Sequence, residues 1–107
     1  MSDAARRWLA AQAADAPPEL VDAMLAALPA EGDEPVPDAL AAGALRLYRT
    51  LLNGAGGRED ALPLLAADAL LTHALQAQAE LDPGGLGDFT RRWGAAGALA
   101  ELSAEVP

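Results

Sequence analysis

Three segments of the chain carry apolar residues at the spacing of an amphipathic helix. They are residues 19–28, 38–52 and 60–81, and in each of them leucine or another large apolar residue recurs every three or four positions. Pro17-Pro18 precedes the first segment and Asn53-Gly54 follows the second, as expected for residues that start and stop helices. The pattern predicts three well-marked helices.

Shorter helices are predicted on both sides of these three. Residues 3–14 have a narrow apolar face, and residues 82–93 begin with Asp-Pro, which resembles an N-cap followed by proline at the first helical position. A last short helix is expected over residues 98–104. The inward side chains predicted for the helix over 82–93 are Leu86, Phe89 and Trp93.

Residues 29–37 interrupt the helical pattern. They hold three prolines, a glycine and three acidic residues, which disfavour a helix and leave little to bury. We predict an acidic, proline-rich linker that crosses the outside of the molecule. Asp38 follows it as the expected N-cap of the helix over 38–52, and Asp60 is the expected N-cap of the helix over 60–81.

The helix over 60–81 has apolar residues on more than one side. Asp68, Thr72, Gln76 and Glu80 form a polar row at i+4 spacing. Leucine and alanine on other sides make the apolar surface wide for so short a chain, and we predict a homodimer that covers the surplus. The expected inward stripe is Leu64, Ala67, Leu71, Ala74 and Leu75, broadened by Leu70 and Leu81. The surplus apolar residues are Leu62, Leu65 and Ala69.

Composition supports an all-helical fold. Of 107 residues, 28 are alanine and 19 are leucine, both strong helix formers, whereas only six residues are β-branched. Such a composition makes a β-sheet implausible. We predict an all-α fold, a compact bundle of five or six helices that forms a single helical domain over residues 1–107.

Charge and cysteine content exclude several functions. The formal net charge is −9, which argues against nucleic-acid binding, because that requires a positive surface. No apolar run is long enough for a membrane span, so a soluble protein is predicted. The absence of cysteine excludes disulfides, thiol nucleophiles and cysteine-bound zinc, and it permits the cytoplasmic location that we predict.

Catalytic and metal-binding residue sets are not evident. His73 is the only histidine, and neither Glu80 nor Asp68 stands at a spacing that would form a metal-ligand pair with it. His73 is therefore interpreted as a surface or boundary residue. Ser2 and Ser103 lie near the chain ends, where a nucleophile would be poorly held. The sequence predicts no enzyme activity, no metal and no cofactor.

An Arg-Arg-Trp motif occurs twice. It stands at residues 6–8 and again at Arg91, Arg92 and Trp93. If the two ends meet, four guanidinium groups and two indoles would form one patch for an anion or an acidic partner. Chance repetition in a chain rich in alanine and arginine is the alternative interpretation.

Part of the chain resembles a known family. Residues 64–75 read Leu-Leu-Ala-Ala-Asp-Ala-Leu-Leu-Thr-His-Ala-Leu and look like the Leu-Ala-Gly-Asp-Ala-Leu-Leu-x-x-Ala-Phe segment of trans-isoprenyl diphosphate synthases. Residues 93–97 are similar to the glycine-containing stretch that follows in that family. The likeness spans at most residues 61–102, and both Asp-Asp-x-x-Asp motifs of the family are missing. The resemblance implies a reduced helical relative that has lost prenyl transfer and kept a bundle with an apolar groove.

Two functional hypotheses follow. The first is a small non-enzymatic helical protein that acts through self-association or through contact with a protein partner. The second is a binding module for a small apolar, isoprenoid-like ligand, held in a cavity between helices. Ordinary core packing is the competing interpretation of the residues that would line that cavity. These residues are Leu45, Tyr48, Leu71 and Leu75.

Overall fold

Helices joined by turns and loops make up the part of the chain that the computed structural model describes, which is residues 3–30, 32–54, 56–94, 97 and 101. The predicted all-α fold class is confirmed. The last short helix expected over 98–104 lies, apart from Glu101, outside the described residues. The helices are α1 (Asp3–Gln12), α2 (Pro18–Ala27), α3 (Val36–Leu52), α4 (Ala61–Leu81) and α5 (Leu86–Trp93), with 3-10 turns η1 (Arg58–Asp60) and η2 (Pro83–Gly85).

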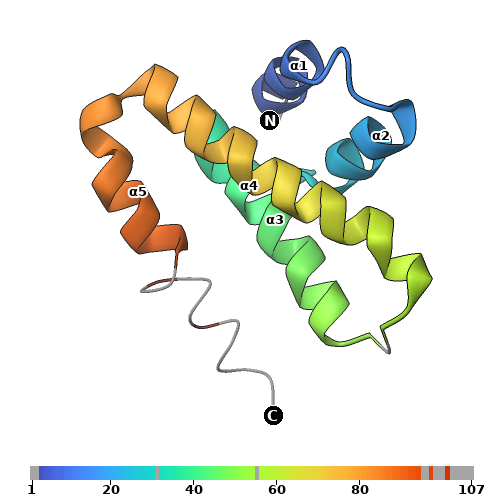
Figure 1. The fold of residues 1–107 in the computed structure, drawn as a ribbon. Helices are drawn as coiled ribbons and strands as arrows, with labels where there is room; N and C mark the ends of the chain where they lie inside the picture. The colour runs from blue at the N-terminus through green and yellow to red at the C-terminus, as the bar shows by residue number, and fades with distance from the viewer. Residues whose placement is uncertain (1–2, 31, 55, 95–96, 98–100, 102–107) are drawn as a thin grey trace.

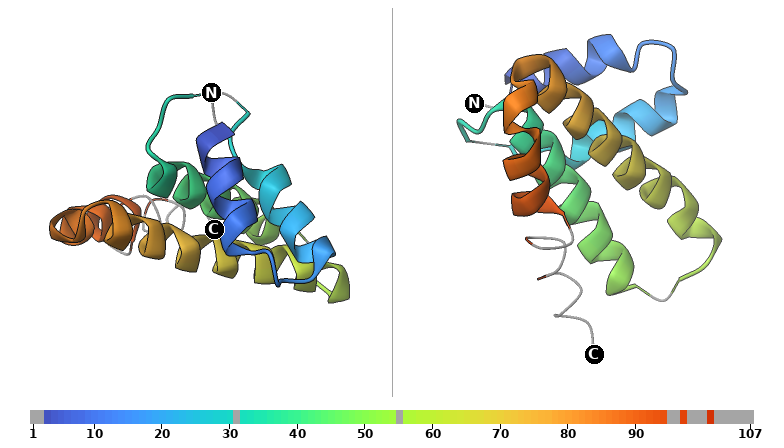
Figure 2. Two further views of the ribbon diagram at one scale, coloured as in Figure 1. Left: turned by 90° about the horizontal axis from the view of Figure 1, so that it is seen from above. Right: turned by 60° about the vertical axis from the view of Figure 1, so that its left-hand side comes forward.

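The hairpin of α3 and α4 forms the centre of the molecule (Figure 1). The two helices run antiparallel and are joined through a glycine-rich turn and η1. Both α1 and α2 lie across one side of this pair, and α5 folds back after the end of α4 (Figure 2). Helices α1 and α2 therefore pack on the α3–α4 pair from one side, α5 packs against α4 after the corner, and the core lies between these elements.

Small side chains let the central helices approach closely. Gly43 of α3 is buried, and a Cβ placed on it would stand 3.3 Å from the Ala27 carbonyl oxygen, from Leu28 Cδ2 and from Leu70 Cδ1. No side chain fits there without movement of its neighbours. Alanines fill much of the rest of the contact, because a side chain of one methyl group permits short distances between helix axes. The buried alanines of α3 and α4 are Ala39, Ala41, Ala44, Ala66, Ala67, Ala74 and Ala77.

The start of α3 differs from the prediction. The helix begins at Val36 instead of Asp38, and the Ala39 amide donates its hydrogen bond to the Pro35 carbonyl oxygen at 3.0 Å. Proline is tolerated in a first helical turn because its missing N–H has no partner there. Pro37 is accordingly helical and buried, and Asp38 is a residue of the first turn and not an N-cap.

The buried face of α4 also differs from the prediction. The expected inward residues Leu64, Leu75 and Leu81 are 47%, 38% and 65% exposed. Leucine occurs on nearly every side of α4, so hydrophobicity alone does not determine which face of α4 is buried. The buried face is the one that fits closely against α3, and a close fit favours small residues. All four residues of the polar row are exposed. The residues that α4 buries are Ala66, Ala67, Leu70, Ala74, Ala77 and Gln78.

Within the described residues, the helices are too short or too polar for any of them to cross a lipid bilayer.

Candidate functional site

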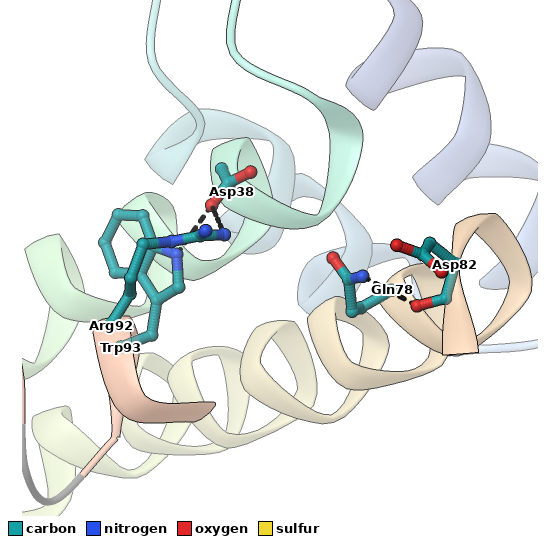
Figure 3. Close-up of polar contacts among 5 residues, drawn as sticks. All are labelled: Asp38, Gln78, Asp82, Arg92 and Trp93. Atoms are coloured by element: carbon teal, nitrogen blue, oxygen red, sulfur yellow. Dashed lines mark hydrogen bonds and ion pairs between the residues drawn. The ribbon is translucent and has the colours of Figure 1, made fainter. Parts of the chain in front are cut away.

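Asp38 in the first turn of α3 receives two side chains from α5 (Figure 3). Its Oδ1 accepts hydrogen bonds from Arg92 Nη2 at 2.9 Å and from Trp93 Nε1 at 2.7 Å. The Asp38 side chain is 15% exposed, whereas that of Arg92 is 57% exposed. Solvent therefore screens the ion pair, and the partly buried indole bond is the stronger contribution. Asp38 therefore links the C-terminal end of α5 to the first turn of α3.

The corner between α4 and α5, formed by Asp82 and η2, sets the direction in which α5 runs toward Asp38. Gln78 is only 7% exposed, and its Nε2 donates to the Asp82 carbonyl oxygen at 2.9 Å, which satisfies a carbonyl at the end of α4 (Figure 3). A Cβ on Gly85 would stand 2.9 Å from both Gln78 Nε2 and Asp82 Oδ2. A side chain at position 85 would therefore require the ends of the Gln78 and Asp82 side chains to shift.

The Asp38 contact makes a testable contribution to stability. We expect Asp38→Ala to lower the free energy of unfolding by about 1–3 kcal/mol, because the indole N–H and the guanidinium lose their common acceptor. Asp38→Asn keeps an oxygen acceptor and should lose less. Urea unfolding followed by circular dichroism measures both. Asp22→Ala, at an exposed position on α2, is the control; an equal loss in this variant would contradict the role given to Asp38.

A pocket of about 440 Å³ lies next to the first turn of α3. Its walls come from three elements: α1, the end of the linker with the start of α3, and the last turns of α4. Among the described residues that line it, Glu80 is the one with a charge, and the others are apolar. Sequence reasoning missed this pocket because it placed residues 35–37 in an external linker. The lining residues are Trp8, Pro35, Val36, Pro37, Ala77, Glu80 and Leu81.

Trp8, which lines this pocket, packs against the ring of His73. The two rings meet edge to face, with centroids 6.0 Å apart and planes at 79°. His73 is half-buried, and its Nδ1 lies 3.1 Å from Gln76 Oε1. This half-buried position agrees with the interpretation of His73 as a surface or boundary residue. Within the described residues, no group of three histidine or acidic side chains lies close enough together to hold a metal ion.

The residues predicted to line a ligand cavity lie elsewhere. Tyr48 and Leu71 are half-buried and pack against the core, Leu45 is half-buried, and Leu75 is 38% exposed. None of these four lines the pocket beside α3. The Tyr48 hydroxyl donates to Asp68 Oδ1. Burial, with further contributions from this hydrogen bond and the Asp68 charge, raises the pKa of Tyr48 to about 12, so the phenol is protonated at neutral pH.

The two Arg-Arg-Trp motifs have separate surroundings. Arg92 and Trp93 meet on Asp38, and Arg91 pairs with Asp88 within α5. Trp8, in contrast, packs against His73. The structure brings Arg92 and Trp93 together, but both side chains already donate hydrogen bonds to Asp38 of the same chain. The predicted patch for an acidic partner would have to compete with Asp38 and Asp88.

Protein-family models, curated proteins and solved structures give no match to this chain. The resemblance of residues 61–102 to isoprenyl diphosphate synthases stays a prediction.

Proposed function

We propose that this chain is a small non-enzymatic helical protein that acts by binding a second copy of itself. The observation that carries the proposal is a group of exposed leucines at the turn between α3 and α4, which we call the leucine patch. Its members are 41% to 54% exposed. The leucine patch consists of Leu52, Leu62, Leu64 and Leu65.

Exposure of the leucine patch to water is unfavourable in free energy. Full burial of one leucine side chain contributes about 1.5–3 kcal/mol, and grouped exposed leucines are typical of contact surfaces. Leu52 ends α3, and the other three members stand in the first turns of α4, so all four lie near the hairpin turn in the chain. Leu62 and Leu65, three positions apart, share one side of α4. Two of them, Leu62 and Leu65, are among the residues for which the sequence predicts a dimer.

The charged residues of α4 and η1 favour a second copy of this chain as the partner that covers the leucine patch. Arg58 and Asp68 stand at equal distances along the chain on either side of Pro63, and both are exposed. Among the described residues Arg58 has no ion-pair partner. A two-fold axis near Pro63 would pack two α4 helices antiparallel and set Arg58 of each copy against Asp68 of the other. The same surface would then be apolar at its centre and complementary in charge at its rim.

Light scattering on size-exclusion fractions tests this proposal. We expect the wild-type chain to have twice the monomer mass of 10.9 kDa, and Leu65→Glu to have the monomer mass with an unchanged helical circular dichroism spectrum. Leu81→Glu is the matched control, because Leu81 is even more exposed, at 65%, but lies at the other end of α4. A monomeric wild-type chain at about 1 mM, or identical behaviour of the two variants, would contradict the proposal.

Charge reversal tests the antiparallel arrangement separately. Arg58→Asp and Asp68→Arg should each weaken the dimer, because each sets like charges against one another across the axis. The double variant should recover most of the loss, since it restores opposite charges with the positions exchanged. Dissociation constants from sedimentation equilibrium give the comparison. Additive losses in the double variant would exclude this pairing.

A further inference from the structure

The pocket beside the first turn of α3 is independent of the leucine patch. Leu81, an exposed lining residue, ends α4, whereas Leu62 and Leu65 lie in the first turns of that helix. A ligand bound here would therefore leave the proposed dimer surface uncovered.

The size and walls of the pocket suit a small molecule. Its volume of about 440 Å³ falls within the range of small-molecule sites in proteins, about 300–1,000 Å³. The two prolines that flank Val36 restrict the backbone of one wall, and the second of them, Pro37, is fully buried in the first turn of α3. The indole of Trp8 makes an edge-to-face contact with His73. Walls that are restricted in this way reduce the entropy lost on binding.

The carboxylate of Glu80 determines which charge on a ligand the pocket favours. Within the part of the chain that the structure describes, Glu80 supplies the only charged side chain of the lining, and it has no ion-pair partner there. An anionic ligand would meet this carboxylate in a chain that already carries a net charge of −9. A cation is attracted both by the carboxylate and by the electron-rich face of an indole such as that of Trp8.

We propose that this pocket binds a small apolar molecule that carries a positively charged amine, such as an alkylammonium ion. The hydrocarbon part lies against Trp8, Val36 and Leu81, and the ammonium group lies at Glu80. Apolar contact provides most of the affinity, and the carboxylate discriminates cations from neutral and anionic molecules of the same length.

Titration with hexyltrimethylammonium, followed by two-dimensional NMR, tests the proposal without any change to the chain. We expect saturable shifts at the Trp8 indole N–H and at the amides of Ala77 and Leu81, with the Trp93 indole unaffected. The neutral analogue 1-hexanol should bind about tenfold more weakly, and hexanoate should bind more weakly still. Equal affinity for hexyltrimethylammonium and 1-hexanol, or the absence of a shift at Trp8, would overturn the proposal.

A pair of variants separates the pocket from the general negative charge of the chain. Glu80→Gln and Glu19→Gln change the net charge by the same amount, but Glu19 lies on α2 and outside the pocket. We expect Glu80→Gln to weaken hexyltrimethylammonium binding by about tenfold and Glu19→Gln to leave it within about twofold. Equal losses in the two variants would show that the cation only accumulates around an acidic protein, and would overturn the assignment.

Discussion

Replacement of Phe89 by alanine is expected to lower the free energy of unfolding by about 3–5 kcal/mol and to detach α5. Phe89 is 1% exposed and is the only fully buried residue of α5, a helix of eight residues. Its ring also lies 5.8 Å from the Arg92 guanidinium, so it supports the side chain that reaches Asp38. Without the ring, the Trp93 and Arg92 contacts lose the packing that positions them.

Urea unfolding and the NMR signal of the Trp93 indole N–H measure the two parts of this expectation. Phe89→Leu keeps an apolar side chain in the site and should cost less than about 1.5 kcal/mol, with the Trp93 signal near its native position. Phe89→Ala should move the Trp93 signal toward that of a solvated indole. A Trp93 signal that is unchanged in Phe89→Ala would contradict the view that Phe89 holds α5 in place.

Replacement of Leu70 by alanine is expected to cost about 2–5 kcal/mol, because Leu70 is fully buried where α2, α3 and α4 meet. The site is coupled to Gly43, since the Leu70 side chain occupies space that a Cβ on Gly43 would enter. We therefore expect Gly43→Ala to be more favourable in the Leu70→Ala background than in the wild-type chain. Chemical denaturation of the four proteins gives the coupling energy, and a value near zero would contradict the described contact.

Proline and glycine made the helix boundaries predictable. The helices expected over 19–28 and 60–81 are observed as Pro18–Ala27 and Ala61–Leu81. Local chemistry decides these limits, because a proline or a flexible glycine turn acts on its immediate neighbours. The error at α3 has the same local origin. An aspartate after prolines suits an N-cap as well as a first turn, and sequence alone does not distinguish the two positions.

The buried face of α4 was not predictable from the same information. Leu64 and Leu70 are equally hydrophobic, yet only Leu70 is buried. The choice depends on which face of α4 fits against Gly43 and the alanines of α3, and this fit is a property of the packed pair of helices. The exposed leucines that form the leucine patch are a consequence of that choice.

The candidate sites depend on contacts between distant parts of the chain. Asp38 meets Arg92 and Trp93 across more than 50 positions, and the pocket brings Trp8 to the last turns of α4. The repeated Arg-Arg-Trp motif drew attention to Arg92 and Trp93, but no local pattern indicates that Asp38 is their acceptor. Periodicity describes one helix at a time, and it therefore gives no information about such pairs.

Chemical cross-linking at Leu65 tests the leucine patch most directly. The chain contains no cysteine, so Leu65→Cys introduces a single thiol, and Ala10→Cys places one at an exposed position on α1 as the control. With a short bismaleimide reagent at equal protein concentrations, we expect Leu65→Cys to give a covalent dimer at least about tenfold faster than Ala10→Cys, because association holds the thiols at high effective concentration. Equal rates for the two variants would contradict self-association through the leucine patch.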